Sequence, residues 1–404
     1  MTRTLIIVGE SDCAILETAL YILELEKEEV RSGDLELCTG SRLTLRPTCW
    51  SKLLDAVSSR FLEIKNTTLS VKLSQLLATK PLQLSILEDC YYEDGGTAFV
   101  NALERRRSIF DSLELSCDHF HDDNLKRLFR VDKIKHLEVR RVKDELILLP
   151  FSAQADSLKY SLLLSTLQGL EAHMHSVNFG TRKLELLLFH SGGPFPTSSF
   201  LSLLRRMAQF DHFAELTIDI MDRGRNLVPD SVVQELIRIV TANCGLQVFN
   251  LPNILSHPYW NAHTTTFFDG LRDHKGLRTF GVTVTDKVEA FGPDFIRLRH
   301  FLSYNRNITV TDGFRDVYTD GLLVDEIYAL NRFYRESKTL VFVPQSERPL
   351  LVATALTRSA SDHFQRSALL LADHADALLD LIQCSPNLTA KHFDAIHDLG
   401  HFES

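Results

Sequence analysis

The sequence predicts an α/β repeat protein: a solenoid curved like a horseshoe, with a parallel concave sheet, outer helices and a helical C-terminal cap. Two observations lead to this prediction. Short apolar strands begin every 30 to 32 residues, at Leu184, Leu216, Leu246, Leu277 and Ile308, and amphipathic stretches precede them. A period of this size is typical of repeat proteins, in which each unit buries its apolar face only against its neighbours.

The predicted strands share a pattern in which two apolar residues flank one residue that faces outward. The examples are Leu113-Glu114-Leu115, Leu137-Glu138-Val139, Leu184-Glu185-Leu186, Leu216-Thr217-Ile218, Leu246-Gln247-Val248, Ile308-Thr309-Val310 and a weaker copy, Leu277-Arg278-Thr279. Upstream, less regularly spaced strands are predicted over 35–37, 62–64, 82–84 and 158–160. Uneven spacing is expected near the end of a repeat array, because terminal repeats are atypical.

Helices are predicted between the strands, over 165–173, 200–207, 232–240 and 295–302. Asp230-Ser231 and Pro293-Asp294 precede two of them, which fits the residues preferred at helix starts. After residue 318 the strand pattern stops, and apolar residues at helical spacing predict helices over 320–334, 350–357 and 367–384. The predicted regions are therefore an N-terminal cap with irregular first repeats (1–80), regular repeats (81–315) and a helical C-terminal cap (316–404).

One stretch carries the closest match to a known repeat. A strand ends in Cys90, a turn contains Gly95-Gly96, and a helix up to Leu103 returns the chain to the strand Leu113-Glu114-Leu115. Over residues 30–315 the chain resembles the leucine-rich-repeat family, in its ribonuclease-inhibitor-like subclass. Leu330-Asn331-Arg332 and the ending Ser385-Pro386-Asn387-Leu388 are the matching pieces by which the tail resembles the helical segment that ends many unicellular-algal proteins of this family. The Asn or Cys that usually follows each family strand is replaced here, for example by Asp118 and Val142, so that ladder is absent or replaced.

Composition restricts the classes of function. An apolar fraction of 44% and a charged fraction of 24% are those of an ordinary folded protein, and the net charge of −9 disfavours nucleic acid and anionic membranes as partners. No apolar run reaches the roughly 20 residues that span a bilayer. The start of the chain lacks a long enough apolar core for a secretory signal, and the seven cysteines show no spacing pattern. We expect a cytoplasmic or nuclear protein.

The sequence indicates no cofactor, metal or catalytic site, and we expect no enzymatic activity. The segment Leu5–Ser11 resembles a strand entering a turn, but it lacks the glycines of a phosphate-binding loop. Cys117, His119 and His121 alternate and would lie on one side of an extended chain, as metal ligands can. The alternative for this segment is a polar loop whose Asp122 or Asp123 caps a helix over 124–129.

The outward strand positions are the candidate binding surface. In the first half they carry Glu36, Glu63, Glu114, Glu138 and Glu185, with Lys159 interrupting the row. One interpretation is an acidic face that steers a basic protein partner, and the other is that Glu merely keeps the strands soluble.

In the second half, the same alternation places Leu187, Thr217, Gln247, Phe249, Arg278 and Phe280 on the concave surface. Leu187, Phe249 and Phe280 would then form an apolar anchor for the partner. The alternative is that strand twist or a covering loop buries these side chains.

From these residues we predict a non-catalytic scaffold that binds an unidentified protein, with a basic surface, on its concave face. The resemblance also implies a second candidate, a regulator of a small GTPase similar to the Ran-type activators that share this repeat subclass. A third, a blocker similar to ribonuclease inhibitor, fits the acidic face but lacks that protein's many cysteines.

Overall fold

The computed structural model describes residues 11–28, 35–38, 46–56, 61–65, 67–80, 84–190, 192, 194–222, 228–252, 260–344, 347–360 and 364–384. The chain divides into two compact units. One consists of residues 1–285 with 310–316, and the other of 286–309 with 317–404. Residues 286–309, which the sequence places among the regular repeats, belong by their contacts to the second unit.

The first unit is built around one sheet, whose described strands number eleven. Their order is β1-β2-β4-β6-β7-β8-β9-β10-β11-β12-β13, so strands that follow one another in the chain also lie side by side. The pairs from β1 to β12 are parallel. The strands are β1 (Leu35–Cys38), β2 (Phe61–Lys65), β4 (Leu84–Glu88), β6 (Phe110–Ser116), β7 (Ile134–Arg140), β8 (Ser157–Leu163), β9 (Lys183–His190), β10 (Glu215–Asp222), β11 (Val248–Leu251), β12 (Thr279–Val282) and β13 (Thr309–Thr311). Strands β3 (Thr68–Leu69) and β5 (Tyr91–Tyr92) form a small separate sheet.

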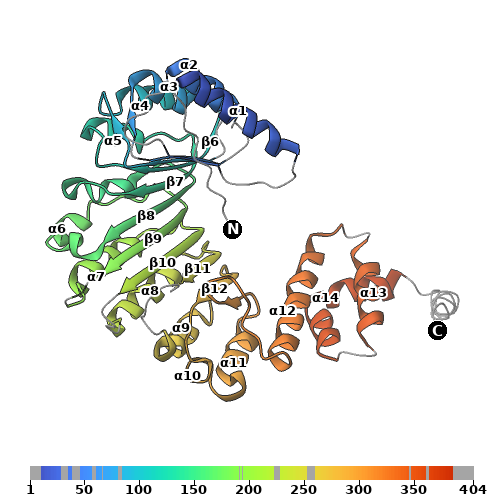
Figure 1. Cartoon of the computed structure of the whole chain (residues 1–404). Helices are drawn as coiled ribbons and strands as arrows, with labels where there is room; N and C mark the ends of the chain where they lie inside the picture. Colours follow the sequence, from blue (N-terminus) through green and yellow to red (C-terminus); the bar gives the residue numbers. More distant parts are fainter. Residues whose placement is uncertain are drawn as a thin grey trace. The chain divides into compact units, whose positions relative to one another are not determined.

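Helices alternate with these strands. They are α1 (Asp12–Glu28), α2 (Pro47–Ala56), α3 (Val71–Thr79), α4 (Thr97–Arg105), α5 (Asp122–Leu128), α6 (Glu171–Met174), α7 (Thr197–Met207), α8 (Asp230–Ala242) and α9 (Thr264–Leu271). In Figure 1 helices α3 to α9 follow one another along one side of the sheet. The predicted α/β class, with a parallel sheet and alternating helices, is confirmed.

The core lies between the sheet and this helix layer. In β9 the residues Leu184, Leu186 and Leu188 are buried, whereas Glu185 and Leu187 between them are partly exposed, as the alternation predicts. The buried face of helix α7, which includes Phe200, contributes to this core. Each fully buried leucine or phenylalanine contributes about 1.5–3 kcal/mol through removal of apolar surface from water.

Polar residues recur every 31 residues in the turns that lead into the strands, at Thr181, His212, Asn243 and His274. We call these four residues the turn ladder. The Nε2 atom of His212 lies 3.2 Å from the Thr181 carbonyl oxygen. The Asn243 amide oxygen accepts a hydrogen bond from Phe213 N at 3.3 Å. The ladder thus satisfies backbone groups in adjacent repeat units, which burial would otherwise leave unpaired.

His274 is the most constrained member of the turn ladder. Its Nδ1 accepts a hydrogen bond from Leu277 N at 2.9 Å, and its Nε2 lies 3.1 Å from the carbonyl oxygens of Val240 and Asn243. Because a backbone N–H can only donate, Nδ1 carries no proton, and the hydrogen on Nε2 serves the two carbonyls. This buried ring therefore links three backbone groups of the repeat units around it.

One predicted helix is interrupted. The stretch 165–173 contains a 3₁₀ turn (Leu164–Leu167) and the short helix α6, separated by Gly169 at φ 81°. A left-handed residue ends helical hydrogen bonding, and glycine adopts that conformation without strain.

The second unit is helical. It contains α10 (Lys287–Phe291), α11 (Ile296–Tyr304), α12 (Leu323–Thr339), α13 (Arg348–Ala360) and α14 (Phe364–Cys384). The predicted helices over 320–334, 350–357 and 367–384 are thus present. The buried Asn331 donates to the Leu302 carbonyl at 2.9 Å, and the buried His374 Nε2 lies 2.9 Å from the Ser337 carbonyl.

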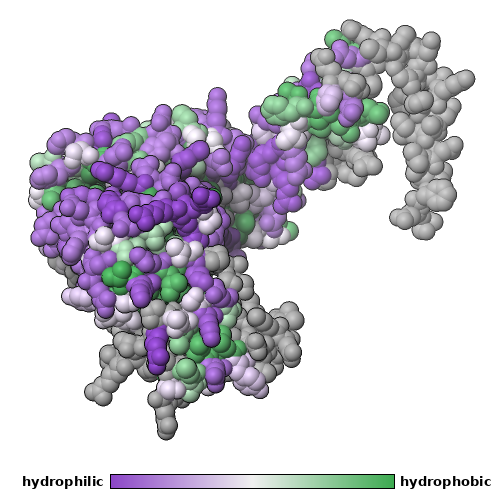
Figure 2. All heavy atoms as spheres, turned by 90° about the horizontal axis from the view of Figure 1, so that it is seen from above, coloured by the Kyte–Doolittle hydropathy of each residue, from purple (hydrophilic) through white to green (hydrophobic). Residues whose placement is uncertain are grey.

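Several large apolar side chains of this unit are exposed. Phe342 is 89% exposed and Leu350 67%. Figure 2 shows hydrophobic residues gathered among the helices near the C-terminal end. Across the described residues, no helix is both long enough and apolar enough to cross a membrane.

Candidate interaction surface

The face of the sheet opposite the helix layer carries the predicted site positions. We call it the open face. It is defined by the outward residues Ser112, Glu114, Ser116, His136, Glu138, Arg140, Ser157, Lys159, Ser161, Lys183, Glu185, Leu187, Glu215, Thr217, Asp219, Val248, Asn250 and Thr279. One row runs in register across seven strands, through Glu114, Glu138, Lys159, Glu185, Thr217, Asn250 and Gly281. Parallel pairing therefore holds these side chains about 4.8 Å apart from strand to strand.

Arg140 neutralises the carboxylates of Glu114 and Glu138, with which this row begins. Its Nη2 lies 2.7 Å from Glu114 Oε1 and 2.9 Å from Glu138 Oε1, and its Nη1 lies 3.9 Å from Glu88 Oε1. Lys159 Nζ lies 3.0 Å from the other Glu138 oxygen. Burial, and then the neighbouring Glu138 carboxylate, raises the pKa of Glu114, although Arg140 and Lys159 oppose the shift. The predicted stack of like charges is thus compensated within the chain.

A groove of about 670 Å³ crosses the middle of the open face. Its lining includes ion pairs, such as Lys183 Nζ to Glu215 Oε1 at 2.5 Å. It also includes uncharged hydrogen-bonding groups, among them Ser112, Ser157, Thr217, Asn250, Thr279 and Thr311. The groove can therefore pair with both charged and neutral polar groups of a ligand.

Two carboxyls on this face are unlike the rest. Glu185 lines the groove, and Asp219 lies two residues beyond Thr217 on the adjacent strand. Within the described part of the chain neither makes a hydrogen bond or an ion pair, and Asp219 Oδ1 is buried without a partner. Burial raises the pKa of Glu185. Burial, together with the nearby Glu185 charge, raises the pKa of Asp219 to about 7.

His136 and Ser157 form the one contact on this face that resembles a nucleophile with its base. The His136 Nδ1 lies 2.7 Å from Ser157 Oγ. His136 is exposed, and no acidic side chain among the described residues bonds its ring to orient it. A catalytic pair needs that third group and an oxyanion-binding site, so we assign this contact no chemistry.

The predicted apolar anchor is wrong. Phe249 and Phe280 are fully buried, and their rings stack with centroids 5.9 Å apart in the core. In the sheet, the inward-facing Leu216 of β10 pairs with Phe249 of β11, and Phe249 pairs with Phe280 of β12. Strands β11 and β12 therefore begin later in the chain than the predicted starts at Leu246 and Leu277. Leu246 and Leu277 are themselves buried in the preceding turns.

The buried position that the sequence placed at Leu246 and Leu277 is taken within the strands by Phe249 and Phe280, three residues later, and this offset has a local cause. Asn243 ends helix α8 and the chain turns through Gly245 before β11 begins at Val248. Period-two alternation holds only within a strand, so counting it from Leu246 across a turn reverses the faces. The signal that was missed is the second alternating pair, Phe249 with Leu251, which repeats as Phe280 with Val282.

The remaining predicted positions divide into two groups. Glu114, Glu138, Glu185, Leu187 and Thr217 lie on the open face. Gln247 and Arg278 are exposed, but they lie in the turns before β11 and β12, where the Gln247 carbonyl accepts from Arg278 N at 2.8 Å. The side chains of Glu36 and Glu63 lie outside the described residues. Sequence reasoning noted Arg140 and Lys183 as cations that flank the glutamate row, but it did not predict that Arg140 contacts both Glu114 and Glu138, and it missed Asp219 as a buried acid.

The segment with alternating Cys117, His119 and His121 does not converge. Cys117 is buried, whereas His119 stacks on Tyr91 with centroids 4.2 Å apart and His121 is exposed. In the part of the chain that the structure describes, no group of three or more His, Cys, Asp or Glu residues could hold a metal ion. Asp122 and Asp123 lie in the first turn of α5, where negative charge favours the helix.

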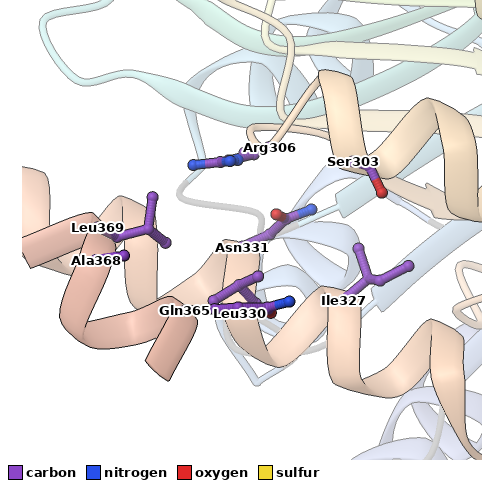
Figure 3. A pocket seen from close by; sticks show the side chains of 8 residues that line it. All are labelled: Ser303, Arg306, Ile327, Leu330, Asn331, Gln365, Ala368 and Leu369. Carbon is purple, nitrogen blue, oxygen red and sulfur yellow. The ribbon is translucent and has the colours of Figure 1, made fainter. Parts of the chain in front are cut away.

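The second unit has a pocket of about 420 Å³ beside α11, α12 and α14 (Figure 3). Two of its polar side chains already have partners. Asn331 bonds the Leu302 carbonyl, and the Arg306 guanidinium lies 4.9 Å from the centre of the Tyr334 ring. The rest of the lining is largely aliphatic, including Ile327, Leu330 and Leu369.

Comparison with known proteins adds no relative to this description. No protein-family model matches the sequence, and no curated protein shows a significant match to it.

Proposed function

We propose that this chain is a divergent leucine-rich-repeat scaffold of the ribonuclease-inhibitor-like type, which binds a protein partner on the open face and catalyses no reaction. The observation that supports the proposal most is that face itself. It carries a groove lined by charged and neutral polar side chains, opposite the helix layer. In the proposed solenoid this face is the concave side of a horseshoe.

The size of the face suits a protein ligand. From β4 to β13 the sheet makes eight strand-to-strand steps, or roughly 38 Å at about 4.8 Å each. A standard protein interface buries about 800 Å² on each partner. The side chains start from regular strands, so a partner would meet a preformed surface with little ordering cost.

The charge pattern favours a partner with alternating polar groups over a uniformly basic one. Glu138 is paired with Arg140 and Lys159, and Glu215 with Lys183. Because the two charges of each pair lie close together, their electric fields largely cancel at a distance. We therefore expect these pairs to orient a bound partner rather than to attract it from afar. The predicted basic character of the partner is therefore confined to the region of Glu185 and Asp219.

A single bulky charge in the groove tests the proposal. We expect Thr217→Arg to block partner binding, because Thr217 lines the groove. Ser198→Arg is the matched control, since Ser198 is exposed on α7 in the helix layer. Proteins retained by the immobilised wild-type chain and by Ser198→Arg, but lost from Thr217→Arg, would support binding at the open face. Equal retention by all three folded proteins would contradict it.

A further inference from the structure

We propose that Glu185 and Asp219 together form a receptor for one basic side chain, Lys or Arg, of the protein that binds the open face. This inference rests on the proposed function and adds the chemistry of the partner. It is carried by three observations: the groove, the missing partners of the two carboxyls, and the burial of Asp219.

The two carboxyls lie on adjacent strands. Glu185 on β9 pairs in register with Thr217 on β10, and Asp219 is the next outward residue of β10. Diagonal neighbours of this kind have Cα atoms about 7 Å apart, within reach of one bridging cation. Glu185 and Thr217 both line the groove, so a ligand in the groove meets Glu185 directly, and Asp219 lies two residues beyond Thr217 on the same face.

Asp219 is 3% exposed, and its Oδ1 has no hydrogen-bond partner. Burial of a carboxyl in this state is costly unless a cation or a donor reaches it. The pKa of Asp219 is accordingly raised to about 7, first by burial and then by Glu185. A guanidinium or ammonium group over Glu185 would supply the missing charge and donor together.

Two cations lie near this pair. Lys159 is paired with Glu138, and Arg315, in the loop after β13, lines the same groove. Both lower the pKa of Glu185, but neither forms an ion pair with it. On β11, the described residues Val248, Phe249, Asn250 and Leu251 include no titratable group. His136 is the titratable ring that faces the same groove from β7. Among the carboxyls of the open face that the structure describes, Glu185 and Asp219 are therefore the pair left for an external cation.

The test uses a fluorescein-labelled hexa-arginine peptide as a surrogate for a basic segment, and a hexa-citrulline peptide of the same shape without charge. Anisotropy at constant ionic strength gives the affinity of the full chain at pH 6 and pH 8. With a pKa of about 7, roughly one tenth of Asp219 is ionised at pH 6 and roughly nine tenths at pH 8. We expect hexa-arginine binding to strengthen about tenfold between these pH values, and hexa-citrulline not to bind.

The variants separate this site from general attraction to an acidic protein. Asp219→Asn and Glu185→Gln should each weaken binding about tenfold at pH 8, and Asp219→Asn should lose most of the pH dependence. Asp211→Asn removes the same charge from an exposed turn and should bind as the wild type does. Equal affinities for Asp219→Asn and Asp211→Asn, or no hexa-arginine binding by the wild type, would overturn the receptor. A partner lost from Thr217→Arg but kept by Asp219→Asn would leave the proposed function intact and remove this inference alone.

Discussion

The Nη2 atom of Arg140 lies 2.7 Å from Oε1 of Glu114 on the neighbouring strand. The same guanidinium donates two hydrogen bonds to Oε1 of Glu138, from Nε at 3.0 Å and from Nη2 at 2.9 Å. One cation therefore joins carboxylates of β6 and β7 that would otherwise repel. This contact changes the interpretation of the glutamate row, because the charges of Glu114 and Glu138 are compensated before any partner arrives.

Replacement of Arg140 by Met should destabilise the protein at neutral pH. Glu114 and Glu138 would face each other without a cation, and breaking such a partly buried pair costs about 1–3 kcal/mol. The raised pKa of Glu114 gives the sign of the pH dependence: protonation relieves the repulsion, so the loss should shrink as the pH falls toward 4.5. Urea denaturation of both proteins at pH 7.5 and pH 4.5 measures the difference.

Arg141 offers the matched control for that experiment. It pairs with Asp89, but its side chain is 58% exposed. Exposed ion pairs are worth about 0–1 kcal/mol, so Arg141→Met should change the unfolding free energy little. Equal losses for Arg140→Met and Arg141→Met would contradict the central role of Arg140.

Asp219→Asn should stabilise the folded chain above neutral pH. The pKa of Asp219 in the folded chain, about 7, exceeds the ordinary value of 3.8, so folding favours the protonated acid. The free energy of unfolding of the wild type therefore falls as the pH rises from about 4 to about 7. Asparagine cannot ionise and escapes this penalty. The variant's advantage should be about 1 kcal/mol at pH 4.5 and reach about 4 kcal/mol at pH 8. Denaturant titrations at the two pH values test this, and an advantage independent of pH would contradict it.

His274→Ala should lower the unfolding free energy by about 2–4 kcal/mol. The change leaves the buried Leu277 N–H and the two carbonyls without their partner and opens a small cavity. His274→Asn places at this position the side chain that serves at Asn243, and should recover part of the loss. His175, which is exposed at the end of α6, is the control for loss of a histidine. Thermal and urea unfolding would refute the ladder role if His274→Ala matched His175→Ala.

Phe249→Ala should destabilise the protein by about 3–5 kcal/mol, the cost of removing a fully buried ring from a packed core. Phe342→Ala, at an 89% exposed position, should change stability by less than about 0.5 kcal/mol. Far-UV circular dichroism melts of both variants provide the comparison. If the Phe249→Ala protein were as stable as the wild type, the burial of Phe249 in the core would be contradicted.

Much of the architecture followed from local patterns. Period-two alternation identified the strands around Leu113, Leu137 and Leu184, and helical spacing identified α7 and α8. Both patterns arise from backbone geometry and from the need to bury one face, which neighbouring residues encode directly. For the same reason Glu114, Glu138, Glu185 and Thr217 were placed on the correct face of the sheet.

The sequence by itself determined the alternation of helix and strand and which strand residues face outward where a strand continues unbroken. Only the tertiary structure decided the register of β11 and β12, and with it the burial of Phe249 and Phe280. It also decided that Arg140 reaches Glu114 and Glu138, while no cation among the described residues forms an ion pair with Glu185 or Asp219. The physical reason is that a turn can shift a strand by any number of residues, and that the partner of a charged side chain is set by which strand lies beside it.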